Sequence, residues 1–440
     1  MEEIMSLSTQ PYKGARDFYP EDKRKQKYMF GVMRSVVEKY GYEEYDAPIL
    51  EPLELYAAKS GEEIVNEQTY TFEDRGGRKV AIRPEMTPTV SRMVAGRRQE
   101  LAYPVRWYSI PNLWRYERPQ RGRLREHWQL NVDLFGLSGI EAEHELIMTA
   151  DAIMKAFGAK PETYLFRLNS RKLIDAAMLD YLGLEQTQAY SLIKLIDRMH
   201  KLEPAAFTAQ LDAILSMSQR EDGTEDKLTA LLKVKDLKHL PDELKEHPSV
   251  VELAKLMAML SDSLVTNVTF DITLMRGFDY YTDIVFEVFD TDPENNRSMF
   301  GGGRYDGLVG LFGVEEVATV GFGMGDVTLQ NFLETHKLLP VLKPETEVYV
   351  ALLGDVYAPA QRVIAELREM GVAVAIDPSG RKAEKQIKQA AKKGIRYMLF
   401  IGENELKDQQ YTLKDIVSGI EERHSLQRVV TIIKDFRKDT

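Results

Sequence analysis

The stretch 115–136, RYERPQRGRLREHWQLNVDLFG, concentrates residue types that can bind a phosphorylated ligand. Its first half, 115–125, carries five arginines and one acid, although the whole chain has a formal net charge of −11. Arginine donates paired hydrogen bonds to phosphate and stacks on planar rings. We therefore interpret this stretch as a candidate site for a ligand that is both phosphorylated and planar.

The second half of the stretch alternates with the period of a half-buried strand. Each kind of side chain falls on one face: Gln129, Asn131 and Asp133 on the polar face, and Trp128, Leu130, Val132 and Leu134 on the apolar face. The preceding segment 107–117 can pair with it as the other arm of a hairpin, which places Arg115 and Glu117 on one face. A polar stripe is most often a solvated face, but the aromatic residues here favour two occupied faces. The pattern predicts a polar sheet floor beneath a ligand.

The composition limits the classes of protein that remain. The 440 residues are 44% hydrophobic and 29% charged, which is ordinary for a globular protein of two or three domains. There is no cysteine, which excludes disulfides, thiolate metal sites and cysteine nucleophiles. The seven histidines form no close pair, so a divalent ion would have to be held by carboxylates and phosphate. Without a signal-peptide core or a membrane-length apolar run, we expect a cytoplasmic enzyme or binding protein with no membrane association.

The segments before the arginine stretch contain the expected positioning elements. Helical spacing over 21–40 predicts an amphipathic helix. A strand ends near Ile82, and we expect Thr87 to cap the helix that follows. Glu85 lies at this junction, where an acid can face a ligand or stabilise the first turn of the helix, and the local pattern does not separate the two interpretations.

The segments after it change character twice. Residues 171–261 are rich in Leu, Ala, Lys and Glu at helical spacing, which predicts an all-helical insertion without catalytic residues. Strand character returns at 268–274 and 284–289, followed by the glycine-rich segments 299–308 and 320–326. The sequence GFGMGD is neither a Walker motif nor GxGxxG, so we interpret its glycines as places of close approach to a ligand or a helix.

The last hundred residues follow a linker at 340–347 and alternate strands with helices, as a small α/β domain does. Residues 381–396 carry seven basic residues and one acid. A charged helix face is usually only solvated, but this asymmetry favours a polyanionic partner.

Several of these segments together resemble the class II histidyl-tRNA synthetases, over essentially the whole chain. RYERPQRGRLRE with Gln129 and Asp133 resembles the second class motif, and RGFDYYT at 276–282 resembles the histidine-specific signature. GGGRYDGL, KGARDFYP and RPEMTP are also similar to family segments. The helix at 21–40 with Pro48 resembles the first class motif, which implies a homodimer.

The resemblance implies an α+β fold with a class II synthetase antiparallel-sheet catalytic core. The core would comprise residues 1–168 and 263–340, interrupted by a helical insertion at 169–262. A C-terminal α/β anticodon-binding domain would occupy residues 345–440.

The implied activity is that of a histidine–tRNA ligase. Histidine would attack the α-phosphate of ATP to give histidyl-adenylate and pyrophosphate, and the 3′ end of tRNA-His would then take the acyl group. The implied partners are L-histidine, ATP and tRNA-His, with Mg²⁺ bridging the outer phosphates. No protein ligand of the metal is assigned.

The resemblance also implies roles for individual residues. The histidine-binding set is Glu85, Met86, Thr87, Arg115, Gln129, Asp133, Arg276, Tyr280 and Tyr281. The ATP-binding set is Arg115, Glu117, Arg123, His127 and Arg304. Arg276 and Arg115 would be catalytic, because both would stabilise charge on the α-phosphate during in-line attack.

Three positions depart from the family pattern. His127 stands where an aromatic Phe is usual, and Leu124 where a tyrosine is common. Thr328 stands where the third class motif usually has an arginine that contacts ATP. We expect Arg123 or Arg304 to supply that contact, and either His127 or its neighbour Trp128 to stack on adenine.

Three other functions compete with ligation as explanations of the sequence. A catalytically silent paralogue that regulates ATP phosphoribosyltransferase would lack the anticodon-binding domain and usually the histidine signature. Arg276, Glu85 and Arg115 argue against a tRNA-sensing module that does not aminoacylate. The pair Tyr280 and Tyr281 argues against a synthetase for another amino acid.

Overall fold

The computed structural model describes residues 7–57, 67–275, 280–295 and 297–438. Its contacts separate the chain into two compact units, Met1–Phe18 with Gln26–Leu339, and Tyr19–Lys25 with Pro340–Thr440. Helix α1 (Pro20–Lys39) carries the apolar spacing expected of it, and buries Met29, Met33 and Val37.

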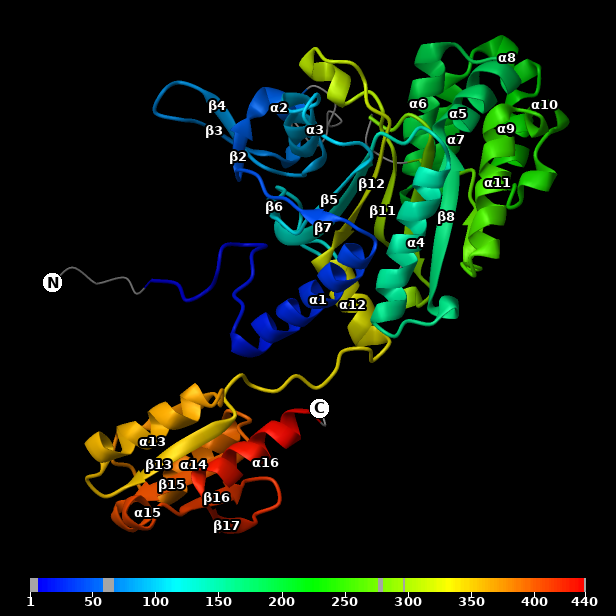
Figure 1. The fold of residues 1–440 in the computed structure, drawn as a ribbon. Coiled ribbons are helices and arrows are strands. Elements are labelled where there is room, and N and C mark those ends of the chain that lie inside the picture. The colour runs from blue at the N-terminus through cyan, green and yellow to red at the C-terminus, as the bar shows by residue number, and fades with distance from the viewer. Residues whose placement is uncertain (1–6, 58–66, 276–279, 296, 439–440) are drawn as a thin grey trace. The chain divides into compact units, whose positions relative to one another are not determined.

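One large sheet organises the first unit (Figure 1). Within the described residues it has nine strands in the order β1-β5-β7-β12-β11-β10-β8-β9, with β6 paired to β7 beside this path. The strands are β1 (Glu43–Glu44), β5 (Val105–Ser109), β6 (Asn112–Trp114), β7 (Glu126–Phe135), β8 (Tyr164–Ser170), β9 (Val268–Phe270), β10 (Ile284–Asp290), β11 (Ser298–Arg304) and β12 (Thr319–Gly325). All pairings are antiparallel except β1 with β5 and β8 with β9. The predicted α+β class with an antiparallel core is confirmed.

The predicted hairpin is present in a modified form. Both β5 and β6 pair antiparallel with β7, and the chain between them interrupts the first arm. Because Arg115 and Glu117 follow β6, they lie on the loop rather than on the strand.

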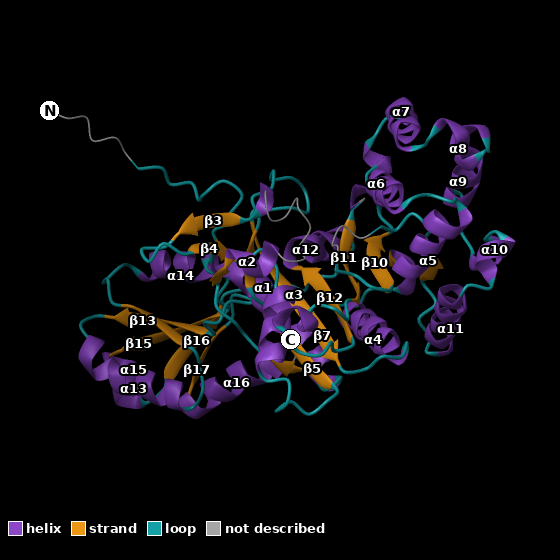
Figure 2. Ribbon diagram, turned by 90° about the horizontal axis from the view of Figure 1, so that it is seen from above, coloured by secondary structure: helices purple, strands orange, loops and turns teal. Residues whose placement is uncertain are grey.

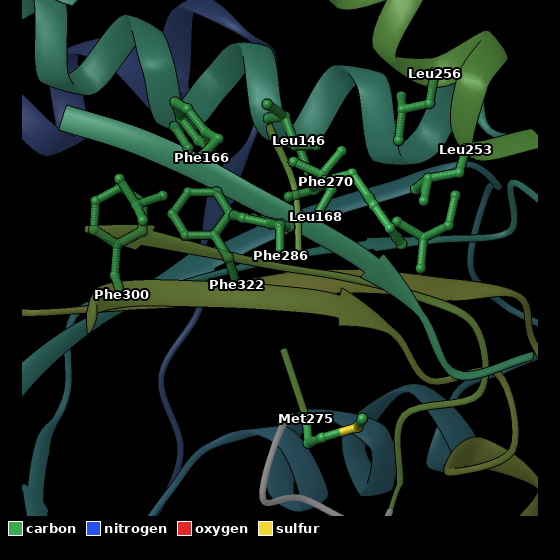
Figure 3. Close-up of a cluster of buried hydrophobic side chains, with 14 of the residues drawn as sticks. Leu146, Phe166, Leu168, Leu253, Leu256, Phe270, Met275, Phe286, Phe300 and Phe322 are labelled. Atoms are coloured by element: carbon green, nitrogen blue, oxygen red, sulfur yellow. The ribbon is translucent and has the colours of Figure 1, made fainter. Parts of the chain in front are cut away.

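The two faces of β7 have separate environments, as its alternation predicted. Leu130, Val132 and Leu134 are fully buried in the main hydrophobic cluster, against helix α4 (Glu141–Ala156). Figure 3 shows this side of the sheet, where Phe286 and Phe322 lie below the helix that carries Leu146. Each such buried side chain contributes about 1.5–3 kcal/mol of transfer free energy. The apolar face of β7 therefore packs the sheet against α4, and the opposite face of the strand carries the polar side chains.

A second, smaller sheet and its helices precede β5. The strands are β2 (Leu50–Pro52), β3 (Tyr70–Glu73) and β4 (Lys79–Ile82), in the order β2-β4-β3, and the helices are α2 (Leu53–Ala57) and α3 (Thr87–Gly96). The prediction that Thr87 caps α3 is wrong. Met86 occupies the N-cap position without a side-chain cap, and Thr87 is the first helical residue. Its side chain is thereby left to face Tyr280.

The predicted helical region is seen between β8 and β9. Its helices are α5 (Arg171–Ala176), α6 (Gln186–Asp197), α7 (Pro204–Ile214), α8 (Met217–Glu221), α9 (Thr224–Leu232), α10 (Asp242–Lys245) and α11 (Pro248–Asp262), green in Figure 1. Helix α11 packs on α4 and β8, and its Leu253 and Leu256 are fully buried in the main cluster. The helical region therefore shares one core with the sheet. Helix α12 (Asp326–Thr335) follows β12 directly.

The second unit has five strands among the described residues, in the order β14-β13-β15-β16-β17. They are β13 (Val348–Leu353), β14 (Val374–Asp377), β15 (Tyr397–Gly402), β16 (Tyr411–Asp415) and β17 (Glu421–His424), with helices α13 (Tyr357–Glu369), α14 (Ala383–Lys392), α15 (Glu403–Asp408) and α16 (Leu426–Lys438). Figure 2 shows α14 on one side of this sheet and α13 and α16 on the other. Helices α13 and α16 contribute to one hydrophobic cluster, whereas α14 contributes to the other. The predicted α/β character is confirmed, and the antiparallel strands β16 and β17 extend it. No helix in the described parts of either unit is both long and apolar enough to span a membrane.

Candidate active site

A cavity of about 850 Å³ lies over the polar face of the large sheet. Four alternate residues of β7 line it: His127, Gln129, Asn131 and Asp133. They share one face because successive side chains of a strand point to opposite sides. The cavity therefore lies over the polar face of β7, where the alternating pattern predicted a ligand.

The glycines of β11 and β12 make room for the side chains of neighbouring strands. A Cβ atom on Gly321 would lie 2.9 Å from the Tyr305 hydroxyl and would also run into the Asp133 carboxylate. A Cβ on Gly323 would lie 2.6 Å from Nε2 of Gln129. These distances are shorter than real contacts allow, so the glycines serve close approach, as interpreted from the sequence.

A cluster of acids and phenols occupies one part of the cavity. The Tyr305 hydroxyl donates a hydrogen bond to Oδ1 of Asp133. The Tyr280 hydroxyl donates to Oε2 of Glu85 at 3.2 Å and lies 3.5 Å from Oγ1 of Thr87. The rings of Tyr280 and Tyr305 meet edge to face with centroids 5.7 Å apart. Residues distant in the sequence thus form one polar subsite.

The carboxylate of Asp133 is suited to receive a cation. It is 4% exposed, and burial raises its pKa to about 7, although the hydrogen bond from Tyr305 opposes that rise. Oδ2 has no hydrogen-bond partner among the described residues. A buried unsatisfied oxygen costs roughly 1–3 kcal/mol, which a bound ammonium group would recover.

An arginine subsite adjoins this cluster. Arg115, Glu117 and Arg123 all line the cavity. Nε of Arg115 donates to the Pro84 carbonyl at 2.9 Å, which orients its guanidinium group. Nη1 of Arg123 lies 3.3 Å from Oε2 of Glu117, so these two charges face each other.

His127 and Trp128 have different surroundings. His127 lines the cavity, where burial and the nearby charges of Arg115 and Arg16 lower its pKa to about 3. Its ring is therefore neutral and can stack on a planar base. Trp128 packs edge-on against Phe18, with ring centroids 5.2 Å apart. Of the two residues, His127 is thus the one that lines the cavity.

Asp326, the first residue of α12, joins the N-terminal segment to the floor of the cavity. Its carboxylate accepts a hydrogen bond from Arg16 at 2.7 Å and another from the backbone N–H of Trp128 at 3.0 Å. The guanidinium carbon of Arg16 lies 4.9 Å from the centroid of the Phe18 ring. These contacts fix the beginning of β7, on which His127 sits.

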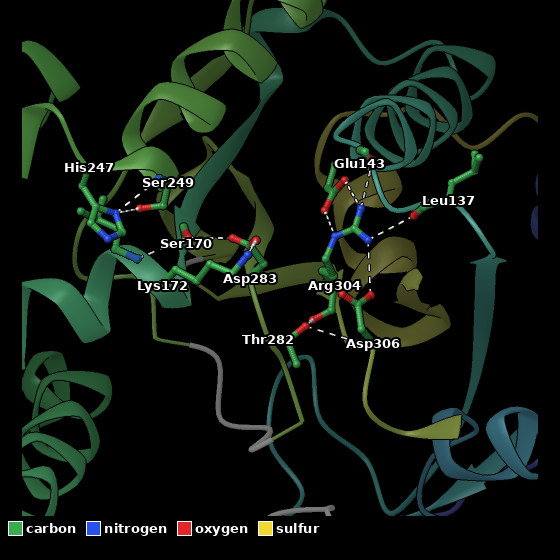
Figure 4. A network of polar contacts seen from close by, with 12 residues as sticks. Leu137, Glu143, Ser170, Lys172, His247, Ser249, Thr282, Asp283, Arg304 and Asp306 are labelled. Carbon is green, nitrogen blue, oxygen red and sulfur yellow. Dashed lines mark hydrogen bonds and ion pairs between the residues drawn. The ribbon is translucent and has the colours of Figure 1, made fainter. Parts of the chain in front are cut away.

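Arg304, which was expected to contact ATP, is not among the residues that line the cavity. Its guanidinium group points toward α4 and forms a two-pronged ion pair with Glu143, at 2.6 and 2.7 Å (Figure 4). It also donates to the carbonyls of Leu137 and Gly139, and it is 5% exposed. A buried arginine with these partners holds the sheet to α4 and is not part of the cavity lining.

Two further residues of the predicted set are not placed at the cavity. Met86 is fully buried in a hydrophobic cluster with Val90 and Phe135, so its side chain does not line the cavity. Arg276 lies outside the described residues. The remaining residues of the set line the cavity together: Glu85, Thr87, Arg115, Glu117, Arg123, His127, Gln129, Asp133, Tyr280 and Tyr281.

The structure adds cavity residues that the sequence reasoning did not assign. Tyr305 follows the glycine segment of β11, and its place in GGGRYDGL was the only available signal. The helical region, in which no catalytic residue was expected, supplies one wall through Lys194, Arg198 and Lys201. Their spacing of four and three residues puts them near one face of a helical segment, but helical spacing alone gave no reason to assign them to a site.

Comparisons with known proteins agree over both units. The family model for histidyl-tRNA synthetase matches residues 14–326, and that for an anticodon binding domain matches residues 347–436. A histidine–tRNA ligase of Leptospira biflexa serovar Patoc is 45% identical over 436 residues, which cover 98% of this chain and 98% of the relative.

Two solved structures share the fold. The histidyl-tRNA synthetase from Nostoc sp. PCC 7120 has a TM-score of 0.79 at 24% identity and covers 98% of this chain and 100% of its own. An ATP phosphoribosyltransferase regulatory subunit/histidyl-tRNA synthetase from Bacillus halodurans has a TM-score of 0.73 at 22% identity, over 90% of this chain and 100% of its own. At these identities the likeness concerns the fold alone.

Proposed function

The chain belongs to the histidyl-tRNA synthetase family, and from this premise we propose that it ligates L-histidine to tRNA-His. ATP, L-histidine and tRNA-His give histidyl-tRNA, AMP and diphosphate, with histidyl-adenylate as the intermediate. The observation that carries this function is the meeting, in one cavity, of the acid and phenol cluster around Asp133 with the arginine subsite around Arg115. The first suits an amino acid and the second suits a nucleotide.

The acid and phenol cluster receives histidine. Glu85 and Thr87 take the substrate ammonium, and Gln129 and Asp133 orient the amino group. The ammonium lowers the pKa of Asp133 when it binds, because an opposite charge nearby favours the ionised carboxylate. Tyr280 and Tyr281 hold the imidazole, and their hydroxyls disfavour side chains that cannot form hydrogen bonds.

The arginine subsite receives ATP. Arg115 binds the α-phosphate, Glu117 accepts a hydrogen bond from the adenine amino group, and neutral His127 stacks on the base. When ATP binds, the Arg123 guanidinium group leaves Glu117 and binds a phosphate oxygen of the nucleotide instead.

The chemical step needs positioning and charge stabilisation more than a protein nucleophile. A carboxylate oxygen of histidine attacks the α-phosphorus, and the bond to the bridging oxygen breaks in line. Arg115 and Arg276 stabilise the charge that develops on the α-phosphate. This role of Arg276 rests on the resemblance of RGFDYYT to the family signature.

Magnesium would arrive with the nucleotide. Within the described residues no group of three or more potential metal ligands occurs, whereas Mg²⁺ usually binds through substrate phosphates and one or two carboxylates. Glu287 lines the cavity and offers such a carboxylate. The ion would neutralise charge on the outer phosphates.

The RNA contacts, the assembly and the location belong to the same proposal. The segment 381–396, with its excess of basic residues, binds tRNA as part of an anticodon-binding domain at 345–440. The catalytic core comprises 1–168 and 263–340, and the insertion 169–262 faces the acceptor end. The protein acts as a homodimer in the cytoplasm, where its tRNA substrate is used.

Charging of tRNA-His with labelled histidine tests this function. We expect ATP-dependent formation of histidyl-tRNA, and no product with a tRNA of another specificity. If histidine binds but no tRNA is charged, the protein is better explained as a regulator of ATP phosphoribosyltransferase. The match of residues 347–436 to an anticodon binding domain favours the ligase.

A further inference from the structure

A second cavity of about 290 Å³ adjoins the first. The two share the lining residues Gly122, Met299 and Thr328. We call the second cavity the annex. Its other lining residues are Gln120, Arg121, Glu294, Asn295, Arg297 and Asn331.

The first arginine of the annex, Arg121, is held by a neutral amide. Its Nε and Nη2 atoms lie 3.2 and 3.0 Å from Oδ1 of Asn295, whereas Glu294 approaches Nη2 only to 3.9 Å. Asn295 in turn donates to the buried carboxylate of Asp290 at 2.7 Å and to Thr335 at 3.1 Å. The guanidinium group is therefore oriented while most of its charge stays available to a ligand.

The second arginine, Arg297, is oriented in a similar way. Its Nη2 donates to Oε1 of Gln120 at 2.9 Å, and this partner is again a neutral amide. The aliphatic part of the side chain lies beside the glycine of the arginine-rich loop, because a Cβ on Gly122 would be 3.9 Å from its Cδ. Two cations thus stand next to the arginine subsite of the main cavity.

Two of the residues that the cavities share, Gly122 and Thr328, are small. The Thr328 hydroxyl turns away to donate to the Met299 carbonyl at 2.6 Å. Gly122 has a φ of +78°, and a Cβ there would lie 3.3 Å from Cγ2 of Thr328. A larger residue at either position would have to displace its neighbour or fill space at the boundary between the two cavities.

We propose that the annex holds the outer phosphates of ATP, and then the pyrophosphate that leaves, with Arg297 and Arg121 as the binding residues. This assignment rests on the proposed function. When the histidine carboxylate forms its bond to the α-phosphorus, the electron pair of the broken bond leaves on the pyrophosphate oxygen. The two guanidinium groups stabilise that added charge. Arg297, rather than Arg304, then supplies the positive charge that Thr328 cannot.

The test is histidine-dependent exchange of labelled pyrophosphate into ATP, with Michaelis constants measured for each reactant. The variants are Arg297→Ala, Arg121→Ala and the conservative Arg297→Lys, with Arg220→Ala in the helical region as the matched arginine control. For both alanine variants we expect the KM values for ATP and pyrophosphate to rise about tenfold, as loss of a charge-assisted hydrogen bond predicts. The KM for histidine should change by less than about twofold, and Arg297→Lys should fall between wild type and Arg297→Ala.

Unchanged KM values for ATP and pyrophosphate in both alanine variants, with intact wild-type exchange, would overturn the assignment. So would a rise confined to the KM for tRNA in the charging reaction, which would make the annex an RNA contact. Absence of exchange in the wild type would instead refute the proposed function. Thermal unfolding of each variant checks that the fold is retained.

Discussion

Tyr305 and Asp133 meet across an intervening strand. The tyrosine follows β11, the aspartate lies on β7, and the Tyr305 hydroxyl donates its hydrogen bond over Gly321 of β12. The contact exists because Gly321 has no side chain to separate the two groups. A residue that lies two strands away therefore opposes the rise that burial causes in the pKa of Asp133.

Replacing Tyr305 by phenylalanine should move the pH dependence of histidine use. The wild-type carboxylate of Asp133 has a pKa of about 7, raised by burial and opposed by Tyr305. Below that pKa the free enzyme holds a neutral acid and loses attraction for the ammonium. Loss of the Tyr305 hydroxyl should raise the pKa of Asp133 by about one unit, which leaves less of this carboxylate ionised at pH 7. We therefore expect kcat/KM for histidine to fall about fivefold at pH 7 and to recover near pH 9.

The Asp133→Asn variant is the control for this interpretation, because it removes the titrating group. The pH profile of kcat/KM for histidine in this variant should keep only the change caused by ionisation of the histidine substrate itself. If Tyr305→Phe and wild type have superimposable profiles, the hydrogen bond does not tune Asp133.

A methyl group at position 321 should interfere with the same contact. We expect Gly321→Ala to raise the KM for histidine by roughly tenfold to a hundredfold, because small displacements of positioning groups are costly. Gly323→Ala should be milder, since the atoms it meets belong to the end of the Gln129 side chain. Michaelis constants for both variants, with circular dichroism to confirm folding, check this order. Equal effects would contradict it.

Arg304 should matter for stability and not for ATP. The Arg304→Ala variant leaves Glu143 buried without its partner, and removing one member of a buried pair costs about 3–5 kcal/mol. We expect a clear fall in the unfolding temperature of the first unit, with an unchanged KM for ATP below that temperature. A changed KM in a protein of unaltered stability would restore Arg304 as a nucleotide contact.

Replacement of Arg276 should affect adenylate formation but not histidine binding. If it stabilises charge on the α-phosphate, Arg276→Ala should slow adenylate formation by about a hundredfold while histidine still binds. Single-turnover adenylate formation and equilibrium dialysis with histidine give the two quantities. Unaltered exchange kinetics in this variant would refute the role.

The sequence predicted the site best where a strand displays different chemistry on its two faces. In β7 the period of two is imposed by the backbone, so Gln129 and Asp133 could be assigned to one surface without knowledge of the partner strands. The class of both units was also predictable, because helical and strand periods differ clearly along the chain.

The sequence failed where side-chain direction depends on distant partners. Three glycines precede Arg304 in β11, and they carry no side chains that would reveal which face the arginine shares. Its partner Glu143 lies 161 positions away. Thr87 was assigned as a cap from its residue type, but the backbone places Met86 at that position. The annex was not visible either, because Arg121 and Arg297 are brought together only by the fold.

Exchange of labelled pyrophosphate into ATP, measured with each of the common amino acids in turn, tests the central proposal most directly. It needs no tRNA and reports adenylate formation alone. The arrangement of Asp133, Tyr280 and Tyr281 beside Arg115 predicts exchange with histidine at a rate far above that with every other amino acid. Exchange with none of them, or with an amino acid other than histidine, would contradict it.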